Sequence, residues 1–293
     1  DNSPLTKADV AAHNIIVAHL EKTEIPVLSE EGKGIPYEER KNWKQLWIVD
    51  PIDGTKEFIK KNGEFTVNIA LIENQKPILG VVFAPALNEL YYSSEENGSF
   101  LADTSGAFSF PSPSRTSGSG KVPDIGDNNE NNDDDFAVAA GAFESPHKSS
   151  ASVTGNADNN KHSDEEVAVA EAALFVQGLE AIGTKLPIPH LIEKFTIVAS
   201  RSHMSPETED YVNEMRQKHG EVELISRGSS LKLCMVAQGK ANCYPRFAPT
   251  MEWDTAAGQA ICMHAGFDVI DWTTKETMKY NREQLLNNWF LVN

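Results

Sequence analysis

Long apolar runs, cysteines and basic residues are all scarce in this sequence. No apolar run approaches the roughly 18 residues that a membrane-spanning helix requires, so we expect no membrane span. The 26 lysines and arginines are outnumbered by 43 aspartates and glutamates, and the net charge of −17 argues against a nucleic-acid binder, which needs a basic face. The three cysteines lack zinc-type spacing and leave one thiol over in any disulfide scheme, which favours reduced thiols in a cytoplasmic setting.

What the sequence does contain is an ordinary globular composition. Its 293 residues are 40% hydrophobic and 24% charged, which suits one large domain or two smaller ones with a real core. The polar opening Asp1–Pro4 lacks the apolar segment of a secretory leader, so we expect a soluble protein without one. The acidic excess does not exclude a small anionic substrate, because a bound metal ion can invert the local electrostatic field.

Composition divides the chain into three parts. Residues 1–102 and 195–293 alternate apolar and polar segments in the manner of folded halves. Residues 103–194 carry 15 acidic and 6 basic residues, and positions 127–135 are all Asp, Asn or Glu. Such a segment buries too little apolar surface to offset the entropy of ordering it. We interpret it as an acidic, partly low-complexity surface insertion; a calcium site or a partner-binding tail is the alternative.

Apolar spacing predicts the secondary structure of the two outer parts. In the first part a helix follows Thr6 and ends before Pro26, and β-rich runs predict a largely antiparallel sheet with strands at 26–29, 46–50, 64–72, 77–83 and 89–93. Residues 65, 67, 69 and 71 predict one strongly apolar strand face. In the last part, strands at 195–200, 221–225 and 241–244 alternate with helices at 205–218, 229–238 and 253–264. A further helix is expected at 165–179.

The segment 47–58 holds two carboxylates three residues apart. An apolar strand delivers Asp50 at its end, and Pro51 interrupts the regular ladder, so Asp53 can face the same point across a tight turn. The carbonyl of Ile52 between them is a third possible oxygen ligand. Oxygen ligands without cysteine or histidine indicate a hard cation such as Mg²⁺, whereas a simple aspartate-capped turn is the alternative.

Two other segments also present carboxylates where an element begins or ends. Glu30, followed by Glu31, ends a short strand, and Asp254 opens a helix. The small residues 256–258 allow this helix to approach another backbone closely. A plain helix cap is the alternative for Asp254, but with the earlier pair the chain presents four carboxylates at element ends.

These motifs resemble those of a known family. Asp-Pro-Ile-Asp-Gly-Thr at 50–55, with Glu-Glu upstream and Trp-Asp-x-Ala-Ala-Gly downstream, is similar to the signature of the inositol monophosphatase-like phosphatases, which are Mg²⁺-dependent and lithium-sensitive. The resemblance is closer to one branch, the CysQ-type 3′(2′),5′-bisphosphate nucleotidases, through the segments 3–9, 54–60, 62–70, 200–203, 228–232 and 244–247. It covers residues 1–101 and 195–293.

The resemblance implies an α+β fold, the layered α-β-α-β-α sandwich of the inositol monophosphatase-like and sugar phosphatases. The family has a helix before its Ser-Pro-x-Thr string, and this chain begins almost at that string, so the usual first helix is expected to be lacking. Residues 103–194 exceed the short connection that the family uses at this point, and we assign the excess no role.

The resemblance also implies the catalytic machinery. The residues that match Mg²⁺ ligands, for two or three ions with inhibition by Li⁺, are Glu30, Asp50, Ile52 through its carbonyl, Asp53 and Asp254. The attacking water is metal-activated and is positioned through the Thr55 hydroxyl, so that no cysteine or serine nucleophile is needed. Asp9 and Glu31 are expected to orient waters around a third, weaker ion.

A second set of residues is expected to hold the substrate. Ser229 and Lys232 begin a helix, and Arg246 offers a planar fork suited to phosphate, although each is an ordinary surface residue in the alternative interpretation. The resemblance assigns substrate contacts to Gly54, Thr55, His203, Ser229, Lys232, Arg246 and Asp254. The part of the nucleotide that is not hydrolysed, above all its 5′-phosphate, is the expected ligand of His203, Ser229, Lys232 and Arg246.

The implied reaction is hydrolysis of adenosine 3′(2′),5′-bisphosphate to AMP and phosphate, with 3′-phosphoadenylyl sulfate as a further candidate substrate. The implied partner is thus a small nucleotide bisphosphate, with no nucleic acid and no membrane span. The implied location is the cytoplasm, with peripheral association with the inner membrane left open. Two alternatives remain: an inositol or sugar phosphate phosphatase with the same metal site, and a non-catalytic scaffold that uses the acidic insertion.

Overall fold

The computed structural model describes residues 6–105, 183–189, 192–199 and 205–293. The described residues belong to one compact unit. The expected helix at 165–179, most of the acidic insertion and His203 lie outside them. The division of the chain into 1–102, 103–194 and 195–293 therefore stays a prediction.

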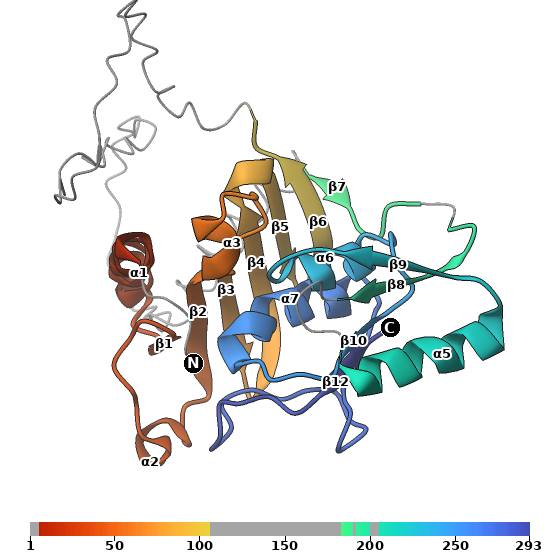
Figure 1. The fold of residues 1–293 in the computed structure, drawn as a ribbon. Coiled ribbons are helices and arrows are strands. Elements are labelled where there is room, and N and C mark those ends of the chain that lie inside the picture. Colours follow the sequence, from red (N-terminus) through yellow and green to blue (C-terminus); the bar gives the residue numbers. More distant parts are fainter. Residues whose placement is uncertain (1–5, 106–182, 190–191, 200–204) are drawn as a thin grey trace, which may run out of the picture. The chain divides into compact units, whose positions relative to one another are not determined.

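A seven-stranded sheet forms the centre of the described fold (Figure 1). Its strands follow in sequence order and all neighbours are antiparallel except β1 and β2, which run parallel. The strands are β1 Val27–Ser29, β2 Gln45–Asp53, β3 Thr66–Glu73, β4 Lys76–Ala84, β5 Glu89–Ser94, β6 Gly98–Asp103 and β7 Thr184–Lys185. The largely antiparallel sheet is confirmed, and β6 and β7 were not expected from the sequence.

Helices cover both faces of this sheet. Alternate residues of a strand face opposite sides, and in β2 Leu46 packs in the same core as the helix α7, Glu252–His264, whereas Trp47 packs against the end of α1, Lys7–Leu20. Figure 1 shows α1 beside β2 and the blue α7 along the other side of the strands. Because Asp50 lies an even number of residues from Leu46, β2 directs it toward α7.

The helix α7 lies unusually close to the sheet. A Cβ atom added at Gly80 of β4 would stand 2.5 Å from the Ala257 carbonyl oxygen and 2.7 Å from the Ala260 Cβ atom. The neighbouring residue Gly258 is in close contact with Leu233. Leu233 belongs to the helix α6, Leu231–Ala237. The small residues at 256–258 therefore do allow the close approach that the sequence predicts.

Two smaller sheets and an outer helix complete the layers. Strands β8, Phe195–Ala199, and β9, Val222–Ser226, are parallel, and a second sheet has the order β10-β12-β11, with bounds Tyr244–Arg246, Phe290–Val292 and Val269–Asp271. The helix α5, Pro206–His219, packs Val212 and Met215 against Ile197 and Cys243 of this layer. The order of α1, large sheet, α6 with α7, small sheets and α5 confirms the α-β-α-β-α sandwich.

Short elements connect these layers. They are the 3₁₀ turns η1 Glu21–Thr23 and η2 Pro85–Leu87 and the short helices α2 Tyr37–Arg40 and α3 Thr55–Ile59. The three cysteines are free, as the sequence predicts, and all three are buried. Among the described residues we find no helix with the length and apolar character needed to cross a membrane.

The apolar face that the sequence predicts in β3 packs with Trp47 and Ile25, but it is not the more deeply buried face. Thr66, Asn68 and Ala70 are 0–1% exposed, whereas Val67 and Ile69 on the expected apolar face are half-buried. The inner face packs against α7 and beside the carboxylates of β2, where the buried polar side chains of Thr66 and Asn68 find a hydrogen-bond partner in Asp53.

Two expected elements in the last part have different bounds. The helix expected at 229–238 begins only at Leu231, because Ser229 has a φ of +45°, which a right-handed helix cannot contain. The strand expected at 241–244 is instead Tyr244–Arg246, since only these residues pair with β12.

Candidate metal and phosphate site

A β-bulge sets the spacing of the two aspartates in β2. Asp50 pairs with Asn68 and Asp53 pairs with Thr66, so three steps along β2 oppose two steps along β3. In a regular strand residues three apart face opposite sides, and the extra residue at the bulge brings both aspartates to one side. The expected tight turn is therefore wrong: β2 continues to Asp53, and Pro51 is tolerated because it lies in the bulge.

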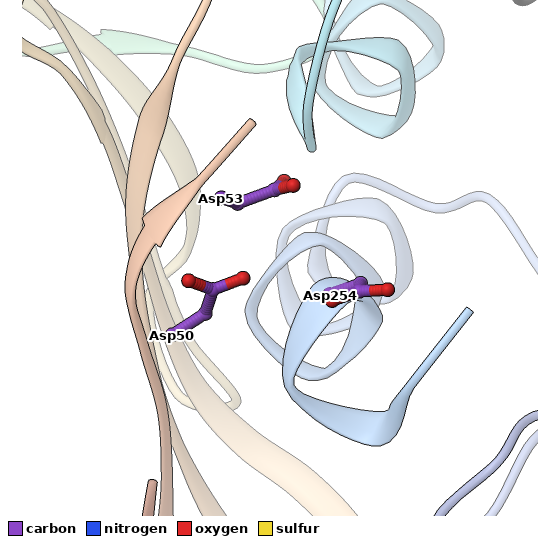
Figure 2. Close-up of side chains that lie close together, drawn as sticks. All are labelled: Asp50, Asp53 and Asp254. Carbon is purple, nitrogen blue, oxygen red and sulfur yellow. The ribbon is translucent and has the colours of Figure 1, made fainter. Parts of the chain in front are cut away.

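Three carboxylates from two distant segments meet beside this bulge. Asp50, Asp53 and Asp254 each have a carboxylate oxygen within 4.8 Å of the others. Figure 2 shows Asp50 and Asp53 on the strand side and Asp254 on the first turn of α7. The Asp254 carboxylate accepts a hydrogen bond of 2.8 Å from the Met251 N–H, so Asp254 lies inside the helix and also closes its first turn.

Hydrogen-bond donors hold Asp53 in place. The Ser230 hydroxyl lies 2.8 Å from Asp53 Oδ2 and 2.7 Å from the Asp254 carbonyl oxygen. Asn68 Nδ2 and Thr66 Oγ1 approach the same Asp53 oxygen at 3.3 and 3.4 Å. Asn68 also donates to Ser230 at 2.9 Å. All three residues contact Oδ2, so they restrict the rotamer of Asp53 without using its other carboxylate oxygen.

Burial and mutual repulsion make the carboxylates of the cluster hard to ionise. Burial raises the pKa of Asp50 well above its usual value, and the carboxylates of Asp53 and Glu30 raise it further. Burial, with a further rise from Asp53, brings the pKa of Asp254 to about 7. Burial also raises the pKa of Glu30 to about 7, although a hydrogen bond with Asp50 acts in the opposite direction. Grouped carboxylates that resist ionisation are a place where cations bind in exchange for protons.

One buried carboxylate oxygen of the cluster indicates that a metal ion fits there. Asp50 Oδ1 is buried and has no hydrogen-bond partner among the described residues, which is costly for a carboxylate oxygen. A divalent cation would satisfy it, and a donor set of carboxylate and carbonyl oxygens suits Mg²⁺. The residues therefore fit the metal that the family uses.

Replacing Asp50 with asparagine should stabilise the metal-free protein, most strongly above neutral pH. Because the pKa values of Glu30, Asp50 and Asp254 are raised in the fold, the folded protein holds protons that the unfolded chain releases, and stability is lost as the pH rises from about 5 through 7. Asparagine removes the ionisable carboxyl group and offers an N–H donor to its neighbours. We expect a gain of about 1–2 kcal/mol at pH 8 in urea unfolding with EDTA.

The matched control for this prediction is Asp210→Asn on the exposed side of α5, which should change stability little at either pH. A larger gain for Asp50→Asn at pH 5 than at pH 8, or no gain at either, would contradict the argument from charge repulsion.

Glu30, Glu31 and Asp9 lie close to the cluster in different ways. Glu30 directly follows β1, where its N–H donates to the Val49 carbonyl at 3.1 Å, and it lines the same cavity as Asp50. Burial, with a contribution from Asp9, raises the pKa of Glu31. Asp9 is 2% exposed, and its carboxylate closes the first turn of α1 by accepting from the Thr6 N–H at 2.8 Å. Asp9 therefore already has a structural partner, and its expected role beside water stays a prediction.

Gly54 and Thr55 continue directly from the bulge into α3. Gly54 has a φ of +89°, and a Cβ atom there would lie 3.3 Å from the Ser229 Cβ atom. Thr55 is 7% exposed, and its hydroxyl lies 3.4 Å from the Ile52 carbonyl oxygen. The hydroxyl and the carbonyl expected from the sequence therefore adjoin each other at the end of the bulge.

A cavity of about 510 Å³ joins the carboxylates to the expected phosphate-binding residues. Its lining contains every site residue expected from the sequence except Asp9 and Glu31, which do not line it, and His203, which lies outside the described residues. Five cationic side chains also line it: Lys56, Lys60, Arg227, Lys232 and Arg246. The same cavity is lined by five carboxylates, so its cations equal its acidic groups in number, whereas the whole chain has a net charge of −17. Cations gathered at one end of a cavity favour an anionic ligand there.

The three expected phosphate-binding residues adopt constrained positions in this cavity. Lys232 donates to the Ser229 carbonyl at 2.6 Å, and burial lowers the pKa of its ammonium group to about 8. Arg246 Nη2 donates to the Pro249 carbonyl at 3.1 Å. Within the described ranges, Arg246 Nε and Ser229 Oγ are buried and have no hydrogen-bond partner. Unsatisfied donors on a cavity wall are available to an anion.

Several site residues escaped the sequence analysis. Ser230, Asn68 and Thr66 contact Asp53, and Glu64 contacts the loop at Gly228, but none of them was assigned a role. The available signal was the polar character of positions 66 and 68 in an otherwise apolar strand. Position 230 offered no local signal, because its partner is 177 residues away along the chain.

Comparison with known proteins agrees with this geometry. The model of the inositol monophosphatase family matches residues 1–131 and 136–291. The 3′(2′),5′-bisphosphate nucleotidases CysQ of Salmonella typhimurium and of Escherichia coli K12 are 38% and 36% identical, each over 100% of this chain and 86% of the relative. The crystal structure of CysQ from Bacteroides thetaiotaomicron is 42% identical, with a TM-score of 0.72 over 100% of this chain and 85% of that one.

More distant structures share the fold alone. SaIMPase-II with bound 2′AMP is 18% identical, with a TM-score of 0.57 over 99% of this chain and 79% of that one. The carboxylates beside the bulge, the layered sandwich and a family match over nearly the whole length lead to one conclusion: this chain belongs to the inositol monophosphatase family.

Proposed function

We propose that this chain is a 3′(2′),5′-bisphosphate nucleotidase that converts adenosine 3′(2′),5′-bisphosphate to AMP and phosphate. The observation that carries the proposal is the shared cavity, in which the carboxylate cluster and the cations Lys232 and Arg246 line one space. A monophosphate requires one anion subsite, whereas a bisphosphate requires a second one away from the metal. The CysQ relatives named above support the same substrate.

The metal ligands that we propose are Glu30, Asp50, the Ile52 carbonyl, Asp53 and Asp254. When bound, Mg²⁺ supplies Lewis-acid stabilisation of the phosphoryl oxygens and lowers the pKa of water. Three of these carboxylates have oxygens within 4.8 Å of one another. We propose further that the full ligand set binds two or three ions.

The protein's own groups position the reactants. Thr55 presents its hydroxyl at the start of α3, where we propose that it orients the attacking water. Ser229, Lys232 and Arg246 bind the phosphate that stays on the nucleotide, through a hydroxyl, an ammonium and a guanidinium group. His203 is proposed as a fourth member from its sequence position. Little covalent chemistry is required, because phosphoryl transfer depends mainly on positioning and on neutralising charge.

A phosphate-release assay tests this function. Adenosine 3′,5′-bisphosphate, inositol 1-phosphate and adenosine 3′-monophosphate are compared with and without Mg²⁺. We expect the bisphosphate to have the highest kcat/KM and EDTA to abolish turnover. A higher kcat/KM for inositol phosphate would favour the alternative sugar or inositol phosphatase, and no turnover of any ester would favour the non-catalytic scaffold.

Lithium inhibition is a separate expectation from the resemblance. Li⁺ should inhibit bisphosphate hydrolysis in the millimolar range by replacing one Mg²⁺ in the carboxylate cluster, whereas K⁺ at equal ionic strength should not. The measurement is turnover as a function of LiCl at fixed Mg²⁺. An unchanged rate in millimolar Li⁺ would place the chain outside the lithium-sensitive branch.

The remaining expectations stay predictions. They are activity on 3′-phosphoadenylyl sulfate, a cytoplasmic location with peripheral association with the inner membrane left open, the absence of nucleic-acid binding, and the interpretation of residues 103–194 as a surface insertion.

A further inference from the structure

We propose that Glu64 is a positioning residue that holds the loop Arg227–Ser230 in its ligand-binding shape. Glu64 lies between α3 and β3, far along the chain from the loop it contacts. The inference deepens the proposed function and rests on it, because it explains how Ser229 and Lys232 come to face the second phosphate of the substrate.

The Glu64 carboxylate anchors the beginning of the loop with both oxygens. Its Oε2 accepts a hydrogen bond of 2.9 Å from the Gly228 N–H, and its Oε1 lies 3.4 Å from Arg227 Nη1. Glu64 is 8% exposed and Gly228 is buried, whereas the Arg227 side chain is half-exposed. The bond to Gly228 is therefore the buried and stronger restraint, and the ion pair with Arg227 is the weaker one.

The carboxylate cluster anchors the other end of the loop. Ser230 is 1% exposed, and its hydroxyl lies between Asp53 Oδ2 and the Asp254 carbonyl oxygen at 2.8 and 2.7 Å. Two carboxylates, one from the connection before β3 and one from β2, thus hold the two ends of a four-residue loop. Glu64 acts at the end away from the metal ligands, so its effect on the loop can be separated from effects on metal binding.

Between these anchors Ser229 adopts a conformation that needs support. Its φ of +45° is unfavourable for a residue with a side chain. Its hydroxyl is buried without a hydrogen-bond partner in the described part of the chain, and the residue lines the cavity. Its carbonyl accepts from Lys232 Nζ at 2.6 Å. A loop released at Gly228 could relax Ser229 and turn both groups away from the ligand.

At Gly228 the loop packs tightly against Glu64 and Glu57. A Cβ atom at Gly228 would stand 2.7 Å from the Glu64 carbonyl oxygen and 2.9 Å from the Glu57 Cγ atom. Gly228 therefore packs against the backbone of Glu64 and is also hydrogen-bonded by the Glu64 carboxylate. Both contacts restrain the loop at the same residue. By contrast, a Cβ atom at Gly34 would meet nothing within 4 Å, which makes Gly34→Ala a matched control for Gly228→Ala.

The experiment compares Glu64→Ala with the conservative Glu64→Gln on two substrates. Adenosine 3′,5′-bisphosphate carries the second phosphate, and adenosine 3′-monophosphate lacks it. For Glu64→Ala we expect KM for the bisphosphate to rise about tenfold, with kcat and the Mg²⁺ concentration for half-maximal activity within about twofold of the unsubstituted protein. The monophosphate kcat/KM should stay within about twofold, so the preference for the bisphosphate falls about tenfold.

Two further variants check the route of the effect. Glu64→Gln keeps an oxygen acceptor for the Gly228 N–H and should restore the bisphosphate KM to within about threefold. Gly228→Ala should reproduce Glu64→Ala, and Gly34→Ala should match the unsubstituted protein. Melting temperatures of all variants are measured beside the kinetics, since general loss of folded protein lowers the rate on both substrates equally.

Three results would overturn the inference: an unchanged substrate preference in Glu64→Ala, an equal loss on both substrates, or Glu64→Gln as impaired as Glu64→Ala. Failure of the unsubstituted protein to hydrolyse the bisphosphate would instead overturn the proposed function. The two failures are therefore distinguishable, because one is read in the unsubstituted protein and the other in the variants.

Discussion

Replacing Asp53 with asparagine should lower Mg²⁺-dependent turnover on the order of 10³-fold. Asparagine keeps the size of the side chain, and its amide oxygen can still accept from Ser230. It removes a full negative charge from a group of three carboxylates within 4.8 Å, and a neutral amide is a weak ligand for a hard cation. The measurement is kcat for bisphosphate hydrolysis across a Mg²⁺ titration.

Two comparisons sharpen this prediction. Asp210→Asn makes the same chemical change on the exposed side of α5 and should leave kcat and the Mg²⁺ titration unchanged. Near-normal turnover of Asp53→Asn at limiting Mg²⁺ would remove Asp53 from the proposed ligands. Partial recovery at high Mg²⁺ is the expected pattern, because the remaining carboxylates still attract the ion.

Replacing Gly80 with alanine should destabilise the fold by about 2–3 kcal/mol and also lower activity. The added Cβ atom would stand 2.5 Å from the Ala257 carbonyl oxygen, a backbone atom of α7 that no side-chain rotation can move. The helix must shift away from β4, and it carries Asp254 in its first turn. The free energy of unfolding comes from urea titration, and the rise in the Mg²⁺ concentration for half-maximal activity reports the displaced carboxylate.

The control for Gly80→Ala is again Gly34→Ala, where a Cβ atom meets nothing within 4 Å. Alanine reduces the freedom of the unfolded chain, so in open space it should be neutral or slightly stabilising. A stability of Gly80→Ala within about 0.5 kcal/mol of the unsubstituted protein would show that α7 can move freely over β4.

The local parts of the site could be predicted from the sequence. Asp50, Ile52 and Asp53 lie within four consecutive residues. Their position together at a strand end could therefore be predicted without knowledge of the rest of the fold. The small residues at 256–258 likewise predicted a close helix, and Gly80 is where that contact occurs. The resemblance then placed Glu30 and Asp254 with them, and the cavity does bring these residues together.

The exact path of β2 could not be predicted in the same way. Pro51 signals an interruption, but a tight turn and a β-bulge both satisfy that signal. The choice depends on β3, whose Asn68 and Thr66 pair with Asp50 and Asp53. Pairing between strands is a tertiary property, so the bulge became visible only in the folded sheet.

The sequence by itself determined most element positions and the carboxylates that carry the chemistry. Both depend on the types of residues and on their spacing over a few positions along the chain. Tertiary structure alone decided which polar residues hold those carboxylates and shape the ligand-binding loop. Ser230 reaches Asp53 across 177 residues of chain, and Glu64 reaches Gly228 across 164. Neither contact leaves a periodic trace in the sequence, since a hydrogen bond between distant segments depends only on where the folded chain places its two partners.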